Sequence, residues 1–228
     1  MKSKTLTLLL TIVALSFQNC SSTKVVDAWK AEPSVVNLFK QKNVLVIART
    51  ENNQARLAFE IEIAQALKDR GIKATESYRK APKIYPKREI SEERVEMIRS
   101  LMASEGFNAV VLTVVKDKQT IERTTSNGVY FGATYSSFYP NYYGGFYSYY
   151  RYPYAYGSYY DSFGGYIPTS TSTSTETNYV LETVAYNLDE DAENQLVAVV
   201  TTNLDDPKNA YKTAEKYVSQ MVKHLEDR

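Results

Sequence analysis

The stretch NVLVIAR at residues 43–49 decides the fold, because it is a short apolar run rich in β-branched residues. Such a run is typical of a strand that is buried on both faces of a sheet. Directly after it, Asn52 and Asn53 can cap a helix over residues 54–70, and Gly71 is suited to end that helix. Its apolar residues recur at helical spacing, and they are Leu57, Ala58, Ile61, Ala64 and Leu67.

The alternation of strand and helix continues along the chain. A second strand is predicted over residues 72–77, a second helix begins after the capping residue Ser91, and a third buried strand, NAVVLTVVK, spans residues 108–116. This β-α-β-α-β order predicts an α/β domain. We expect Ile61 and Val111 to lie in its core.

The C-terminal part supplies an antiparallel pair of strands and one more helix. Residues 117–130 form a polar, strand-like continuation, while residues 178–188 and 195–202 are predicted strands joined by an acidic turn at 189–194. Asp206-Pro207 has the cap and first-turn residues of a helix. Its apolar stripe is Ala210, Ala214, Tyr217, Val218, Met221 and Leu225. The predicted fold class is α/β (α+β), with three helices, a roughly five-stranded mixed sheet and an inserted low-complexity loop.

The inserted loop is rich in tyrosine and glycine. Residues 129–175 hold 14 of the 20 tyrosines, carry only Arg151 and Asp161 as charged residues, and lead into a Ser/Thr run at 168–177. So few aliphatic residues cannot build a packed domain of their own. Since closing a long loop costs little more than closing a short one, we expect a Gly/Ser linker in place of residues 131–174 to leave the melting temperature nearly unchanged.

Three interpretations of residues 129–175 stand side by side. The tract is a mobile low-complexity loop, or it is an adhesive surface in which tyrosine rings stack on sugars or on proteins. A membrane-inserting hairpin is disfavoured, because Pro140, Pro153 and the glycine pairs interrupt every alternating run. We interpret Gly144-Gly145 and Gly164-Gly165 as flexible points. The candidate binding residues of the adhesive surface are Tyr150, Tyr152, Tyr154 and Tyr156.

The N-terminus has the order of a bacterial lipoprotein signal. Residues 1–19 contain two lysines and an apolar run at 5–17, and the only cysteine, Cys20, follows at the expected cleavage point. We expect a lipidation site at Cys20, bearing diacylglycerol and acyl chains such as palmitate, and a lipidated tether over residues 20–42. Several acyl chains give a stable membrane anchor. Residues after Cys20 hold no acidic cluster, so the expected location is the periplasmic face of the outer membrane.

Composition excludes several classes of protein. The formal net charge of +1 gives no electrostatic footprint for nucleic acid. One cysteine and one histidine, His224, exclude a disulfide framework and a histidine-based zinc site, and they disfavour a Ser-His-Asp catalytic triad. The acidic turn from Asp189 does not match a calcium loop, because Asn194 and Val200 replace the required glycine and glutamate. The expectation is no enzyme, no metal, and no cofactor besides the lipid on Cys20.

One loop is placed where open α/β sheets bind ligands. Residues 50–53 lie between the carboxyl end of the first strand and the start of a helix, which is the usual ligand crevice. No glycine-rich phosphate cradle is present, and Glu51 opposes an anion. The loop is therefore a candidate for binding without a defined ligand.

The order of elements resembles a set of bacterial envelope lipoproteins. The segments that carry the resemblance are LKDRG at 67–71, ASEGFNAVVL at 103–112 and YVLETVAYNLDEDAENQLVAVVTTNLDD at 179–206. The α/β domain is similar to the N-terminal domain of the Tol-system β-propeller protein and to the periplasmic domain of the curli-secretion lipoprotein. The resemblance supplies no catalytic residues.

Together these features predict a signal peptide at 1–19 and a single α/β domain, formed by residues 43–128 and 176–228 around the insertion at 129–175. The favoured function is a lipid-anchored, non-enzymatic binding or structural module of the cell envelope, with envelope proteins or cell-wall glycan as partners. The alternative is an accessory subunit of an envelope transport or export assembly, which the resemblance implies.

Overall fold

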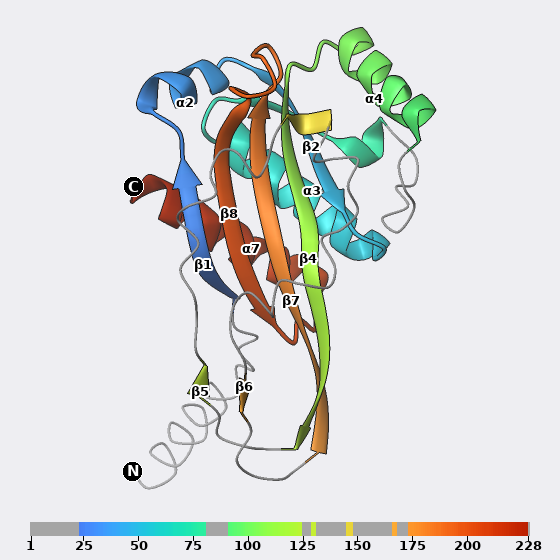
Figure 1. Ribbon diagram of the computed structural model, residues 1–228, viewed down its shortest axis with the longest axis vertical. Coiled ribbons are helices and arrows are strands. Elements are labelled where there is room, and N and C mark those ends of the chain that lie inside the picture. The colour runs from blue at the N-terminus through green and yellow to red at the C-terminus, as the bar shows by residue number, and fades with distance from the viewer. Residues whose placement is uncertain are drawn as a thin grey trace, which may run out of the picture.

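The computed structural model describes residues 23–80, 91–124, 129–130, 145–147, 166–167 and 173–227. Six strands form a mixed sheet in the order β1-β8-β7-β4-β2-β3 (Figure 1). They are β1 (Thr23–Lys30), β2 (Asn43–Arg49), β3 (Lys73–Glu76), β4 (Ala109–Thr124), β7 (Thr173–Asn187) and β8 (Leu196–Asp205). The helices are α2 (Pro33–Phe39), α3 (Asn53–Lys68), α4 (Glu92–Ser104) and α7 (Ala210–Glu226), with a short 3₁₀ turn, η1 (Ser77–Arg79).

Strand direction divides the sheet into two halves. β2 runs parallel to both β3 and β4, as the β-α-β-α-β pattern predicts. β4, β7, β8 and β1 are successively antiparallel, which accounts for the hairpin near the C-terminus. The predicted mixed α/β class is confirmed.

The predicted counts of three helices and five strands are wrong, because the described residues form four α-helices and a six-stranded sheet. The additional elements are β1 and α2, in the segment expected to be a tether. β1 pairs with the outer edge of β8, and its Ala28 is buried against the core. The residue pattern of TKVVDAWK gives little indication of a strand by itself, and the segment becomes a strand because it pairs with β8.

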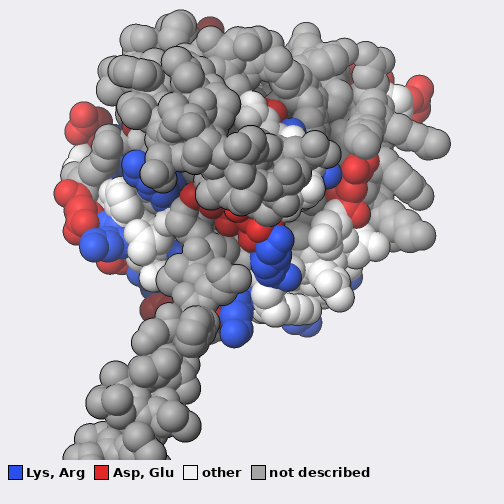
Figure 2. All heavy atoms as spheres, turned by 90° about the horizontal axis from the view of Figure 1, so that it is seen from below, with Lys and Arg blue, Asp and Glu red and all other residues white. Residues whose placement is uncertain are grey.

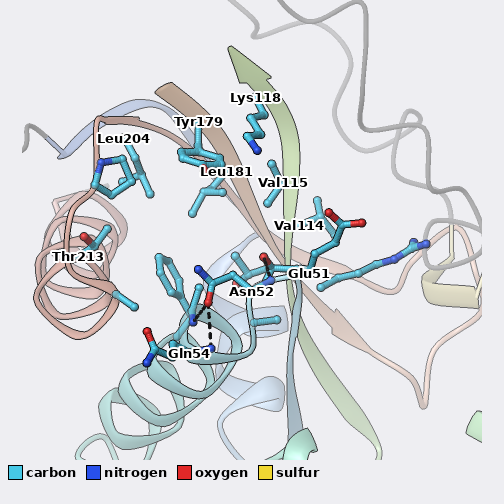
Figure 3. A pocket seen from close by; sticks show the side chains of 18 of the residues that line it. Glu51, Asn52, Gln54, Val114, Val115, Lys118, Tyr179, Leu181, Leu204 and Thr213 are labelled. Carbon is cyan, nitrogen blue, oxygen red and sulfur yellow. Dashed lines mark hydrogen bonds between the residues drawn. The ribbon is translucent and has the colours of Figure 1, made fainter. Parts of the chain in front are cut away.

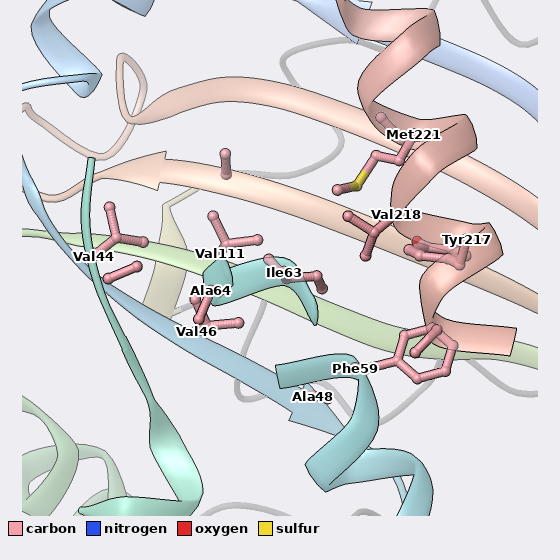
Figure 4. Packing of buried hydrophobic residues seen from close by; sticks show 14 of the residues in the cluster. Val44, Val46, Ala48, Phe59, Ile63, Ala64, Val111, Tyr217, Val218 and Met221 are labelled. Carbon is pink, nitrogen blue, oxygen red and sulfur yellow. The ribbon is translucent and has the colours of Figure 1, made fainter. Parts of the chain in front are cut away.

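The two faces of the sheet are covered by different helices. α3 and α7 pack together on one face, where Figure 4 shows their side chains meeting those of β2 and β4. α4 covers part of the other face, where Val95, Ile98 and Met102 contact the residues of a second cluster. The sheet is thus the middle layer, which is why its central strands are continuously apolar.

The core positions of α3 differ by a rotation from the predicted stripe. Val111 is buried as expected, but Ile61 is only half-buried. The isoleucine of α3 that lies in the core is Ile63, with 1% of its surface exposed. The reason is tertiary: α3 turns Ile63 toward α7 and the sheet, and it turns the polar pair Arg56 and Glu60 toward η1.

Two predicted helix boundaries are confirmed and one is wrong. Asn52 caps α3 by accepting hydrogen bonds from the backbone N–H groups of residues 54 and 55, and Gly71 follows the helix at a φ of 77°. α7 begins at Ala210 behind the cap Asn209, not at Asp206-Pro207. Asp206 has a left-handed φ of 43°, and its side chain pairs with Lys208, so it belongs to the turn before the helix.

A two-stranded ribbon projects from one end of the sheet. Residues 120–124 of β4 pair with residues 173–177 of β7, beyond the last residue of β7 that pairs with β8 (Figure 1). The strand-like continuation after residue 117 is thereby confirmed, and part of the Ser/Thr run is strand. Farther out, β5 (Val129–Tyr130) pairs with β6 (Tyr166–Ile167). The two sides of the insertion therefore pair with each other.

The rest of the insertion lies outside the described residues, except for residues 145–147. Here the structure argues against the expectation that a linker can replace residues 131–174 without a change in melting temperature. Phe146 is fully buried in the second cluster, and its backbone N–H donates to the Gln195 Oε1 at 2.9 Å. A Cβ atom on Gly145 would lie 2.8 Å from the Cβ of Ala192, so this glycine permits close packing instead of providing flexibility.

Glu76 at the end of β3 gives a prediction about acid stability. Its carboxylate pairs with Lys68 at 3.0 Å and with Arg79 at 2.7 Å. Burial raises the pKa of Glu76, but its backbone hydrogen bond, Lys68 and Arg79 together outweigh burial, so its pKa lies below the ordinary 4.5. The charged form therefore stabilises the fold fully above pH 4.5, and this contribution is lost as the pH falls through the lowered pKa.

We expect Glu76→Gln to lower the free energy of unfolding by about 1–3 kcal/mol at pH 7, because a charged hydrogen-bonding group is lost. The difference from wild type should shrink below pH 4.5 and close at more acidic pH. Urea denaturation at several pH values measures this, with Glu215→Gln on α7 as the matched control. A difference that stays constant down to pH 2 would contradict the linkage.

Candidate ligand-binding pocket

A pocket of about 240 Å³ lies at the carboxyl end of β2, between the first turns of α3 and α7. Figure 3 shows that its other wall is the face of the sheet formed by β4, β7 and β8. The predicted ligand-binding loop borders it through Thr50, Glu51 and Asn52. The topological argument from sequence therefore located one rim of the pocket.

The walls of the pocket are mainly apolar. Aromatic and branched side chains come from α3 and the sheet, while alanines stand where larger residues would fill the space. The apolar lining residues are Ala48, Ala55, Phe59, Val114, Val115, Leu181, Leu204, Pro207 and Ala210. Such a lining favours binding of an apolar group from water.

A line of hydroxyl groups leads from the pocket into the core. Thr113 of β4 lines the pocket, and its Oγ1 lies 2.7 Å from the Oγ1 of Thr183 on β7. The Thr183 Oγ1 lies 2.7 Å from the hydroxyl of Tyr217 on α7. These mutual hydrogen bonds fix the buried polar groups of three elements behind the apolar walls.

A β-bulge determines which charge reaches the pocket. The register between β4 and β7 shifts between Val115 and Asp117, so that Val115 pairs with Leu181 and Lys118 pairs with Tyr179. Because successive strand residues point to opposite faces, the extra residue places Lys118 on the pocket face and Asp117 on the other. In a strand without the bulge, the alternation of side chains would place Asp117 on the pocket face and Lys118 on the opposite face.

Lys118 stands at the mouth of the pocket. Its ammonium nitrogen lies 5.9 Å from the centre of the Tyr179 ring, within reach of a cation–π contact. In Figure 3 the Lys118 side chain points toward the pocket, whereas the Glu51 side chain extends away from Leu181 and Leu204. The mouth therefore presents a cation beside an aromatic ring.

The remaining charge at the rim is partly neutralised. Lys208 lines the pocket, and its Nζ lies 2.6 Å from the Asp206 Oδ2. The Lys208 hydrogen bond holds the pKa of Asp206 below its ordinary value, so the Asp206 carboxyl group is ionised at neutral pH. Lys208 thus adds less net positive charge to the pocket than Lys118 does.

The pocket chemistry suits binding. Its ionisable lining residues are Arg49, Glu51, Lys118 and Lys208, a set with no histidine, cysteine or pair of carboxylates. Nowhere in the described parts of the chain do three or more metal-ligating side chains come together.

His224 lies near the end of α7 with its Nδ1 2.9 Å from the Gln220 carbonyl oxygen, and Asp189 of the acidic turn pairs with Lys42 at 2.6 Å.

Two predicted sites lie outside the described residues, namely the lipidation residue Cys20 and the four candidate tyrosines Tyr150, Tyr152, Tyr154 and Tyr156. Sequence reasoning missed Lys118 and Phe59 as pocket residues. The only signal for Lys118 was its place in a polar strand after an apolar one, which does not reveal a bulge.

The surface of the described residues carries mixed charge. Seen from the end toward which the ribbon projects, acidic and basic side chains lie interspersed on the visible described part (Figure 2). Among the helices that the structure describes, none has the length and apolar character needed to cross a bilayer.

The chain has structural likeness to solved proteins but no match in sequence to a known family. No family model and no curated protein matches the chain. Among solved structures, the PelC dodecamer from Paraburkholderia phytofirmans matches with a TM-score of 0.42 and 12% identity over 91% of this chain and 99% of that chain. A variant PelC dodecamer from the same organism matches with a TM-score of 0.39 and 11% identity, over 89% and 96% of the two chains.

Likeness at this level assigns neither a family nor a function. The α/β domain expected from the resemblance to envelope lipoproteins is present in the structure, and membership of the Tol-related or curli-related families stays a prediction. What the geometry defines is a mixed α/β domain with an apolar, cation-flanked pocket.

Proposed function

We propose that this protein is a lipid-anchored component of the cell envelope whose α/β domain is a non-enzymatic binding module. The pocket at the carboxyl end of β2 is the observation that supports binding, because it combines apolar wall residues with polar and charged side chains that can orient a ligand. The lipoprotein-like order of basic, apolar and cysteine residues at the N-terminus supports the anchor. The proposed location is the periplasmic face of the outer membrane, with envelope proteins or cell-wall glycan as partners.

Cys20→Ser is the test of the anchor. We expect the precursor to stay unprocessed and the domain to be lost from the outer-membrane fraction, because lipidation requires the thiol. Fractionation of cell envelopes followed by intact-mass measurement distinguishes the processed, lipidated form from the precursor. Ser21→Ala, at the next residue, is the matched control and should behave like wild type. Normal processing and outer-membrane retention of Cys20→Ser would refute the lipoprotein proposal.

A second candidate function is an accessory subunit of an envelope transport or export assembly. Two open strand edges favour it. Among the described residues, β1 has no strand neighbour on its outer side. The ribbon formed by β4 and β7 projects beyond the end of β8. An open strand edge is a template for pairing with another chain.

Oligomeric state separates the two candidates. A subunit of a ring or larger assembly should sediment as a multiple of the protomer mass after mild detergent extraction, and a simple binding module should not. A Pro substitution at Val26, an exposed β1 residue, should break the assembly if β1 forms the contact.

A further inference from the structure

We propose that the pocket binds a small amphiphile with a single anionic group, specifically an aryl- or alkyl-carboxylate. This inference rests on the proposed function as a binding module and names the chemistry of its ligand. It follows from the size of the pocket, from its walls and from the position of Lys118.

The size of the pocket limits the ligand. A volume of about 240 Å³ corresponds to roughly eight water molecules in the liquid. It lies just below the range of typical drug-sized pockets, which begins near 300 Å³. A ligand of about ten non-hydrogen atoms is therefore the expected size, whereas an oligosaccharide or a long lipid chain would extend far outside.

The walls select the body of the ligand. Phe59, Leu181 and Leu204 offer apolar surface from three elements, and Ala55 and Ala210 leave room between the two helices. The Phe59 ring is itself held by the Tyr217 ring, with centroids 5.1 Å apart. Removing an aromatic ring or a short alkyl chain from water into this space is favourable. A sugar would need hydrogen-bonding partners on every side, and the apolar side chains of Phe59, Leu181 and Leu204 offer it none.

Lys118 selects the charge of the ligand. Its ammonium group makes no ion pair with a carboxylate in the described part of the chain and contacts only the Tyr179 ring. The bulge in β4 places this cation, and not Asp117, on the pocket face. The other charges at the pocket cancel in number, because Lys208 pairs with Asp206 and the charge of Arg49 is offset by that of Glu51. A ligand with one negative charge therefore balances Lys118.

The probe for the test is 3-(4-fluorophenyl)propionate, and its neutral and cationic analogues are the corresponding propanol and propylamine. The full-length lipidated protein is reconstituted in phosphatidylcholine vesicles, and ¹⁹F NMR line broadening is titrated against protein-free vesicles. We expect saturable binding of the carboxylate, with at least tenfold weaker binding of the amine. The propanol should bind with intermediate affinity, because it keeps the apolar body.

Two pairs of variants locate the binding site. Lys118→Gln should weaken carboxylate binding by about two- to fivefold, as expected for a solvent-accessible ion pair. Lys24→Gln, which changes another exposed strand lysine, should have no effect. Ala210→Leu should abolish saturable binding by filling the pocket, and Ala103→Leu on the exposed side of α4 should not. Ala55→Leu replaces Ala210→Leu if circular dichroism shows that the latter is unfolded.

The outcomes separate this inference from the proposed function. Equal binding of all three probes, or no effect of Lys118→Gln, would overturn the anionic ligand. Unchanged binding to both pocket-filling variants would overturn the pocket as the site. No saturable binding of any probe would refute the ligand class, while the localisation of Cys20→Ser tests the envelope anchor independently.

Discussion

Glu60→Ala is expected to lower the free energy of unfolding by about 3–5 kcal/mol, because it breaks a buried ion pair and removes the acceptor of several buried donors. Glu60 is fully buried, and its Oε1 accepts hydrogen bonds from the Arg56 Nε at 3.0 Å and from the Ser77 hydroxyl at 2.7 Å. The Glu60 Oε1 also accepts from the backbone N–H of Ala48 at 3.1 Å, and the Glu60 Oε2 accepts from the backbone N–H of Tyr78 at 2.8 Å. One carboxylate thus joins α3 to β2 and to η1.

The position of Ala48 explains why β2 needs this carboxylate. β2 pairs with β3 only over residues 43–46, so the later backbone N–H of Ala48 takes its partner from Glu60 instead of from a strand. Removing Glu60 leaves that N–H without its acceptor and takes from the buried Arg56 the carboxylate that its Nε contacts, and a buried unsatisfied donor carries a cost of its own.

Chemical denaturation measures the effect, with Glu62→Ala on the same helix as the control, since Glu62 is only half-buried. Arg56→Leu combined with Glu60→Leu should recover part of the lost stability, because it removes both charges and fills the space. A Glu60→Ala variant within about 0.5 kcal/mol of wild type would show that the network is not a stabilising element. Because Ala48 lines the pocket, the alanine variant should also weaken ligand binding.

Phe146→Ala is expected to cost about 3–5 kcal/mol through lost burial and the cavity left behind. The Phe146 ring is fully buried, with its centroid 5.0 Å from the Tyr147 ring and 5.9 Å from the Tyr186 ring of β7. Tyr147 in turn lies beneath the Arg99 guanidinium of α4, at 4.6 Å from the ring centre. The segment therefore links β7 and α4 across the second face of the sheet.

The same packing changes the expected result for the linker replacement. Excising residues 131–174 removes Phe146 and the first residues of β7, so the melting temperature should fall instead of staying constant. Differential scanning calorimetry measures the melting temperatures of Phe146→Ala and of the excision variant. The control is Tyr211→Ala, which removes an exposed aromatic ring. A Phe146→Ala melting temperature within one or two degrees of wild type would show that the tract does not contribute to the core.

Much of the sheet could be predicted because its strands carry a local signal. The apolar runs of β2 and β4 and the stripe of α7 each contain enough apolar residues at the right period to identify the element without knowledge of its partners. The caps Asn52 and Gly71 are likewise local, since each acts on backbone groups within a few residues.

Other features depended on contacts that sequence periodicity does not encode. β1 is a strand because β8 offers it an edge, and Ile63 replaces Ile61 in the core because α7 and the sheet fix the rotation of α3. Phe146 lies in a tract whose composition shows no core pattern, and it is buried because the turn at Ala192 and the ring of Tyr186 enclose it.

The α/β class, the alternation of elements and the loop at residues 50–53 as one rim of a binding site can be read from residue patterns alone. Those properties follow from short-range periodicity and from the rule that ligands lie at the carboxyl ends of parallel strands. The pocket walls and the charge at the pocket mouth depend on the folded arrangement. The walls come from four strands and two helices that meet only after folding. The charge depends on one extra residue in the pairing of β4 with β7, which reverses the direction of every side chain beyond it.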